Sequence, residues 1–374
     1  EGGDNEGGNT AVGANSLYSL TTGQSNVAIG KGAGQAMTTG LRNIAIGYAA
    51  LDAADSSHDD NIAIGVNAMG AVADNDGSRG EQNVCIGTNA GLGGELGATS
   101  VYFNENVILG YGAVAASNTR QCAGSVFVGK SAGSGTFGSG GSTYDVAIGM
   151  GAMAGALAGC QGNVSIGHNS GAGITSGDHN VLIGKGSGQS FNTGGSNVVI
   201  GYLAGDALTD SNYNTAIGES ALGNDVQGLG SVAVGLGALL LQNRGSAADT
   251  YNTGLGYQTG YSNQTGTANT YVGYRSGYGP TSASNNSSNV GVGKDALLAI
   301  TTGTRNVAVG ATAGDALLAG NYNTFIGNNA GSAITNATHN VMIGDYAGAS
   351  AGDVDKVVFI GQNAAANGAI DSDA

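Results

Sequence analysis

A short pattern of apolar and polar positions recurs along this chain of 374 residues. It starts with Asn, continues with a β-branched residue, a variable residue and an aliphatic residue, and ends with Gly, as in Asn-Val-Ala-Ile-Gly at 26–30. Apolar residues two positions apart share one face of an extended strand, and β-branched residues favour that conformation. We therefore predict a short strand before each of these glycines and a tight bend at the glycine itself.

The closing glycine occurs twenty times, and the intervals between its copies define a repeat. Eleven of the nineteen intervals are 17 residues and none is shorter, so the longer intervals are insertions into a 17-residue unit. A unit this short buries apolar surface only by stacking on its neighbours. The sequence thus predicts an all-β fold, a parallel β-solenoid (β-roll) of about twenty coils. The glycines are Gly13, Gly30, Gly47, Gly65, Gly87, Gly110, Gly129, Gly149, Gly167, Gly184, Gly201, Gly218, Gly235, Gly256, Gly273, Gly293, Gly310, Gly327, Gly344 and Gly361.

Each position of the repeat leads to an expectation about where its side chain points. The residues three and one before the glycine are always β-branched or aliphatic, so we expect them to fill one narrow core. The variable residue between them is expected on the opposite face. Asn stands four before the glycine in sixteen of twenty copies, which predicts a stacked amide ladder. The exceptions are Ser125, Asp145, Ser231 and Val357.

The residue three after the glycine is always Ala, Ser or Thr, which indicates a close approach to another surface. Because a 17-residue coil encloses little volume, we expect this small column and the variable strand position to pack on other copies of the chain. A parallel homotrimer closed about a three-fold axis is the expected assembly. The predicted organisation is an N-terminal segment at 1–8, a continuous solenoid at 9–365 with insertions concentrated at 47–167, and a C-terminal tail at 366–374.

The repeat resembles the Asn-Thr-Ala-Ile-Gly repeats of phage tail-fibre proteins, as at 214–218 and 323–327. It is also similar to the head repeats of trimeric autotransporter adhesins, whose usual unit is shorter. The resemblance implies a structural fibre protein of the virion that contributes to host-surface attachment and is not an enzyme. Its partners would be itself, other fibre or tail proteins at the ends, and a cell-surface glycan or protein. The alternative is a bacterial trimeric adhesin head or an extracellular filament subunit at the cell surface.

Charge and cysteine content narrow the classes of partner. The formal net charge is −15, from 11 basic and 26 acidic residues, which argues against nucleic acid or anionic membranes as partners. No apolar run approaches the length of about 18–20 residues that spans a membrane, so membrane insertion is not expected. Cys122 and Cys160 lie at equivalent places two coils apart, too far for a disulfide within one chain. We expect both of them and Cys85 to be free thiols, and pairing between chains at an axis is the alternative.

Candidate chemistry is sparse, and we predict no catalytic residue, cofactor or metal site. The acidic run at 52–60 has carboxylates that suit Ca²⁺, but it lacks the calcium-binding β-roll pattern and a solvated loop is favoured. The stretch 124–131 fits a phosphate-binding loop, yet its centre is itself a predicted strand. The four His residues are scattered and are interpreted as surface turn residues.

Aromatic residues in the insertions and in a Tyr-rich stretch form the candidate receptor face. Insertions in a solenoid project from one face and often bind partners, although neutral drift explains them equally well. Aromatic rings can stack on sugars, although a ladder that packs coils or chains together is favoured for the Tyr-rich stretch, which also holds Tyr251 and Tyr271. The candidates are Tyr102, Phe103, Phe137, Tyr144, Tyr257, Tyr261, Tyr274 and Tyr278.

Overall fold

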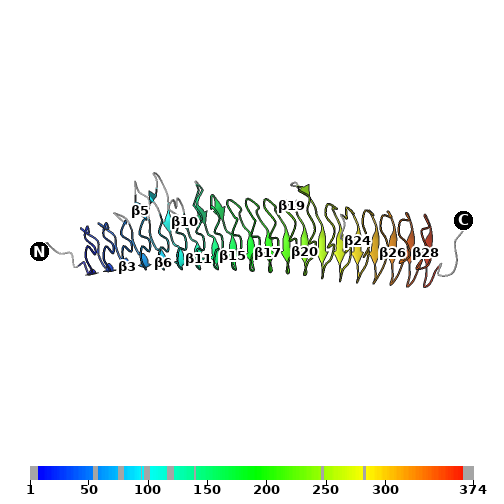
Figure 1. Cartoon of the computed structure of the whole chain (residues 1–374), viewed down its shortest axis with the longest axis horizontal. Coiled ribbons are helices and arrows are strands. Elements are labelled where there is room, and N and C mark those ends of the chain that lie inside the picture. Colours follow the sequence, from blue (N-terminus) through cyan, green and yellow to red (C-terminus); the bar gives the residue numbers. More distant parts are fainter. Residues whose placement is uncertain are drawn as a thin grey trace. The chain divides into compact units, whose positions relative to one another are not determined.

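The computed structural model describes residues 7–53, 58–74, 80–93, 95–96, 102–115, 122–138, 140–245, 248–280 and 284–364. The chain divides into two compact units, Glu1–Gly194 and Gly195–Ala374, here called unit 1 and unit 2. Each unit is a parallel β-solenoid, and no helix occurs among the residues described. Within each unit, successive coils stack with their main strands in a row (Figure 1). The predicted all-β solenoid is thereby confirmed. The predicted tail at 366–374 lies outside the described residues.

Ten main strands of three residues each form the sheet of each unit. Those of unit 1 are β1 (Thr10–Val12), β2 (Val27–Ile29), β3 (Ile44–Ile46), β4 (Ile62–Ile64), β6 (Val84–Ile86), β9 (Val107–Leu109), β11 (Val126–Val128), β13 (Val146–Ile148), β15 (Val164–Ile166) and β16 (Val181–Ile183). Those of unit 2 are β17 (Val198–Ile200), β18 (Thr215–Ile217), β20 (Val232–Val234), β22 (Thr253–Leu255), β23 (Thr270–Val272), β24 (Val290–Val292), β25 (Val307–Val309), β26 (Thr324–Ile326), β27 (Val341–Ile343) and β28 (Val358–Ile360).

The strands pair in parallel and in exact repeat register, so each column of the sequence becomes a column in space. Val307 pairs with Thr324, Ala308 with Phe325 and Val309 with Ile326. The short side strands follow the same rule. They are β5 (Ala73–Asp74), β7 (Glu95–Leu96), β8 (Phe103–Asn104), β10 (Cys122–Ala123), β12 (Ser142–Thr143), β14 (Cys160–Gln161), β19 (Gly228–Leu229) and β21 (Ala248–Asp249).

The predicted core columns of the strand were wrong, and the two faces are exchanged. In nearly every described main strand the middle residue is buried and its two neighbours are only partly buried or exposed, as at Ala308 between Val307 and Val309. The ladder Asn lies two residues before the middle residue and is also buried, because alternate residues of a strand share a face. The residue type at the middle position therefore varies because side chains of different sizes fill the interior, and not because the position is exposed to solvent.

The small column is also buried, but inside its own chain. Ala296, Ala313 and Ala330 are fully buried within unit 2, so this column needs no second chain to cover it. The expectation that the small column contacts another copy of the chain was wrong. The two sides of each coil lie so close together that only a small side chain fits between them.

Large middle residues are matched by glycine four residues after the repeat glycine. A Cβ added at Gly331 would lie 2.4 Å from the ring of Phe325, and one added at Gly277 would lie 2.4 Å from the ring of Tyr271. Where the middle residue is Ala216, the matching position holds the buried Leu222 instead. In these coils a large side chain at one position is accompanied by a small one at the other, so both are accommodated in the same interior.

Close contact between neighbouring coils explains why the repeat position holds glycine. Gly310 has a φ of 142°, and a Cβ on it would lie 2.3 Å from the carbonyl oxygen of Gly327 in the next coil. Only glycine allows the coils to stack this closely at the bend.

The predicted amide ladder is confirmed and is buried. The Asn306 backbone N–H and Nδ2 both donate to Asn289 Oδ1, at 3.0 and 3.1 Å, and Nδ2 also donates to the Gly320 carbonyl at 2.8 Å. Asn306 Oδ1 in turn accepts the backbone N–H and Nδ2 of Asn323, each at 3.0 Å. Every polar atom of the amide has a partner, as burial requires.

We expect Asn306→Ala to lower the free energy of unfolding of the solenoid by about 2–4 kcal/mol, since it leaves buried groups of two neighbouring coils without partners. The control is Asn328→Ala, which removes an exposed amide from the same unit. Chemical denaturation and amide hydrogen exchange measure the effect. Equal losses in the two variants would contradict a structural role for the ladder.

Candidate functional site

The insertions form their own small sheets beside the main strands. In unit 1, β8, β10, β12 and β14 pair in parallel, and β5 pairs with β7. Figure 1 shows β5 and β10 displaced to one side of the row of main strands. In unit 2, β19 pairs with β21, with Gly228 opposite Ala248. The side strands agree with the expectation that insertions project from one face. Of the insertions predicted within 47–167, parts of the inserted segments 73–79 and 95–105 lie outside the described residues, at 75–79 and 97–101.

In unit 1 the side strands accompany two of the places where the Asn ladder is interrupted. The Asp145 backbone N–H donates to Ser125 Oγ at 3.1 Å, and the Asn163 backbone N–H donates to Asp145 Oδ1 at 2.7 Å. Ser142 Oγ, on β12, donates to Asp145 Oδ2 at 2.5 Å. Burial raises the pKa of Asp145, and the hydrogen bonds from Ser142 and Asn163 offset part of that effect.

In unit 2 a second buried network replaces the ladder at Ser231. The Gln242 side chain takes over the missing amide: its Nε2 donates to Asp225 Oδ2 at 2.5 Å and to Ser231 Oγ at 3.1 Å, and its Oε1 accepts Asn252 Nδ2 at 2.9 Å. The Ser231 and Thr250 hydroxyls are 2.6 Å apart. Burial raises the pKa of Asp225, while the bond from Gln242 acts to lower it.

Two of the predicted receptor-face aromatics are not on the surface. Phe103, on side strand β8, and Phe137 are buried in unit 1, so they were wrongly assigned to a binding face. Tyr102 and Tyr144 are exposed, Tyr144 by 63%. Tyr271, in the Tyr-rich stretch of unit 2, is also buried.

The four remaining candidates form two stacked pairs in unit 2. The rings of Tyr257 and Tyr274 have centroids 5.3 Å apart and lie 7° from parallel, and those of Tyr261 and Tyr278 are 5.1 Å apart at 17°. The Arg275 guanidinium lies 4.5 Å from the centre of the Tyr278 ring. Because the rings stack from coil to coil, their facing sides are already occupied. This geometry suits a ladder that packs coils together better than a platform for a sugar ring.

Another ladder, which the sequence did not suggest, occupies the residue before the ladder Asn. Arg305, Tyr322 and His339 fill this position in successive coils and have positive φ values of 57°, 58° and 61°. The Tyr322 and His339 rings stack with centroids 4.8 Å apart, and the Arg305 guanidinium lies 5.2 Å from the Tyr322 ring centre. The left-handed backbone turns these side chains outward, where they contact one another.

Candidate metal ligands and nucleophiles do not gather into a site. Among the described residues no group of three or more His, Cys, Asp or Glu side chains could hold a metal ion. In the acidic run, Asp60 pairs with Arg42 at 2.6 Å and Asp59 Oδ1 accepts the Leu41 N–H at 2.8 Å, while 54–57 lie outside the described residues. His58 is buried, so it was wrongly interpreted as a surface turn residue.

The cysteines are free, as predicted, and all three are buried. Cys122 and Cys160 lie on β10 and β14, with β12 between them. Burial raises the pKa of Cys160 to about 12, and it raises the pKa of Cys85 further, so neither is a reactive thiolate at neutral pH. The stretch that fits a phosphate loop is strand β11 and the turn after it, which lacks the helix that such a loop requires.

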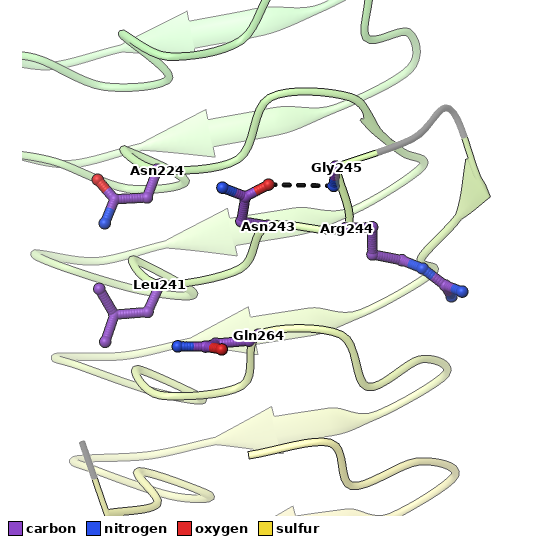
Figure 2. A pocket seen from close by; sticks show the side chains of 6 residues that line it. All are labelled: Asn224, Leu241, Asn243, Arg244, Gly245 and Gln264. Atoms are coloured by element: carbon purple, nitrogen blue, oxygen red, sulfur yellow. Dashed lines mark hydrogen bonds between the residues drawn. The ribbon is translucent and has the colours of Figure 1, made fainter. Parts of the chain in front are cut away.

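Two surfaces were not anticipated from the sequence. One is the outward face of the main sheets, where the Val and Ile columns lie. The other is a hollow of about 330 Å³ in unit 2, lined by Asn224, Leu241, Asn243, Arg244, Gly245 and Gln264 (Figure 2). The sequence at 243–245, Asn-Arg-Gly, gave no signal that distinguishes the second surface, because the turn at this place varies from coil to coil.

Comparison with models of known protein families gives no match, and comparison with curated proteins gives none. Across the residues that the structure describes, there is no helix with the length and apolar character needed to cross a membrane.

The buried carboxyl group of Asp145 predicts a pH-dependent stability. Its pKa is raised in the folded state, so the unfolded chain loses this proton first and stability falls as pH rises from the ordinary value of about 3.9 through the folded pKa. We expect Asp145→Asn to raise the unfolding free energy by about 1 kcal/mol at neutral pH, because its amide still bonds Ser142 and Asn163 without a buried charge.

This gain should vanish below pH of about 4, where the wild-type carboxyl is protonated in both states. Thermal unfolding followed from acid to neutral pH measures it. Glu219→Gln, which neutralises an exposed carboxylate, is the control and should show no such trend. A gain that is the same at every pH would contradict the role of ionisation.

Proposed function

We propose that this chain is a structural segment of a phage tail fibre, that it works as a parallel homotrimer, and that it contributes to host-surface attachment. The Asn-Thr-Ala-Ile-Gly-like repeat supports the tail-fibre assignment, and the stacked parallel coils suit a stiff supporting element. The observation that carries the proposal is an apolar sheet face that the single chain leaves uncovered.

This outward face consists of the residues three and one before each repeat glycine. In unit 2, Leu255, Val309 and Ile326 are exposed by 47%, 37% and 39%, and in unit 1 Ile29 and Ile86 are exposed to a similar degree. The next column, directly after the glycine, adds further exposed apolar side chains. They are Tyr48, Val66, Tyr111 and Met150 in unit 1, and Tyr202, Leu236, Tyr257 and Tyr274 in unit 2.

A second copy of the chain is the partner that fits this face best. Contiguous apolar surface of this kind is normally covered by a partner, and burial of each Val or Ile side chain stabilises an assembly by about 1–2 kcal/mol. Only another parallel solenoid has the same spacing from coil to coil, so that each row of side chains meets an equivalent row. Three such faces around one axis form a closed assembly without a free apolar side.

The double variant Val309→Lys and Ile326→Lys should convert the assembly into folded monomers. Both side chains point outward, so the charges disturb the contact between chains and leave the interior of the coil intact. Light scattering coupled to size-exclusion chromatography measures the mass, and circular dichroism checks the β structure. Thr302→Lys, at an exposed turn of the same unit, should remain trimeric. A wild-type chain of monomeric mass with intact β structure would contradict the trimer.

The biological assignment has a separate test. Antibodies raised against the purified chain should label the tail fibres of the virion in electron micrographs and reduce its attachment to cells. Label on the surface of bacteria that carry no phage would instead identify an adhesin head or an extracellular filament subunit, and would overturn the tail-fibre assignment.

A further inference from the structure

The hollow of unit 2 is built from three successive coils. Asn224, Leu241 and Gln264 come one from each coil, and Asn243 shares the coil of Leu241. Backbone hydrogen bonds fix their spacing: the Leu241 N–H donates to the Tyr261 carbonyl at 3.0 Å and the Asn243 N–H to the Gln264 carbonyl at 2.9 Å. Figure 2 shows the three amide side chains and Leu241 on one side of the turn, with the Arg244 side chain extending away from them.

The hollow lies where the usual turn has been replaced. In a regular coil the residue eight after the repeat glycine is often Thr, and its hydroxyl bonds the next coil, as Thr301 Oγ1 does to the Leu318 carbonyl at 2.8 Å. At the hollow this position holds Asn243 and then Gln264. The Asn243 Oδ1 accepts the Gly245 N–H at 3.1 Å, which closes a short turn over 243–245.

The amides of the hollow are available to a ligand. In the part of the chain that the structure describes, no hydrogen bond joins the side-chain amide of Asn224 or Gln264 to another residue, and the Nδ2 of Asn243 is not used by its turn. Three carboxamides therefore face the opening with donors and acceptors side by side.

A buried network supports the edge of the hollow. Gln242 directly precedes Asn243, and its side chain is fully buried and held by Asp225, Ser231 and Asn252. An exposed turn that starts from such an anchored residue has less freedom to lose on binding, which favours recognition by preorganised groups.

We propose that this hollow is a binding subsite for a saccharide unit, recognised through adjacent hydroxyl groups. A carboxamide offers a donor and an acceptor at the spacing of neighbouring sugar hydroxyls, and Leu241 provides an apolar contact for ring C–H groups. The volume of about 330 Å³ lies at the lower end of the range for ligand sites, about 300–1,000 Å³, and suits one or two sugar rings. Arg244 is the one cationic residue among those that line the hollow, and a guanidinium is the group that would pair with a carboxylate on an acidic sugar. The subsite deepens the proposed attachment role and rests on it for its biological meaning.

Saturation-transfer NMR on the full chain tests this, with glucose, galactose, N-acetylglucosamine and glucuronate as separate probes. At least one sugar should receive saturation from the wild-type protein. Asn224→Ala and Gln264→Ala should each weaken its binding about five- to tenfold, the loss expected for one hydrogen bond. Asn328→Ala, an exposed amide elsewhere in the same unit, is the matched control and should bind as wild type.

The comparison of glucose with glucuronate identifies the class of sugar. Preference for glucuronate that Arg244→Gln abolishes indicates an acidic sugar, and equal binding of the two indicates a neutral one. Absence of saturation transfer to all four probes, or transfer that both alanine variants retain in full while circular dichroism shows them folded, would overturn the subsite. Either result leaves the trimer mass and the virion label unchanged, so the proposed function stands or fails separately.

Discussion

The buried amide ladder is the interaction on which the rest of the structure depends. The ladder Asn side chains are buried inside the coil, and a buried polar group is destabilising unless it has a hydrogen-bond partner. Asn supplies an acceptor to the coil that follows, a donor to the one that precedes it and a second donor to the turn of the following coil. The ladder thereby fixes the register in which the strands pair, and the register in turn aligns every other column of the repeat.

Where the ladder lacks its Asn, other buried side chains replace the missing hydrogen bonds. At Asp145 and at Ser231, side chains from outside the repeat pattern, Ser142 and Gln242, complete the missing hydrogen bonds. Ser142 lies in the longer interval before Gly149 and Gln242 in the longer interval before Gly256, so these two insertions supply groups to the polar interior. The insertions are consequently joined to the polar interior of the coil rather than attached only to its surface.

The sequence was sufficient for the architecture but not for the orientation of the strand. The interval between glycines and the Asn column predicted parallel coils and the ladder, because both depend on repetition. The direction of Val309 and Ala308 could not be derived from conservation within the repeat. The inner position varies because Phe325 with Gly331 and Ala216 with Leu222 fill the same space in different ways, a compensation between positions six apart that a single column does not reveal. The buried Phe103 and Phe137 were misplaced for a related reason, since side strands cover part of the surface and create interior where the repeat alone predicts none.

Register has a last consequence, which concerns how such a chain can change in length. Val307, Ala308 and Val309 pair with residues exactly one repeat later, and the same donors and acceptors meet at every junction. Removal of one complete coil would join two surfaces that already fit, whereas a deletion that leaves one coil shorter than 17 residues would disturb the strand pairing of that coil. A whole coil is therefore the unit by which the stacked strands of the solenoid can be added or lost. Recombination between repeats can lengthen or shorten it in whole coils, and the spacing between its ends can evolve without the invention of a new fold.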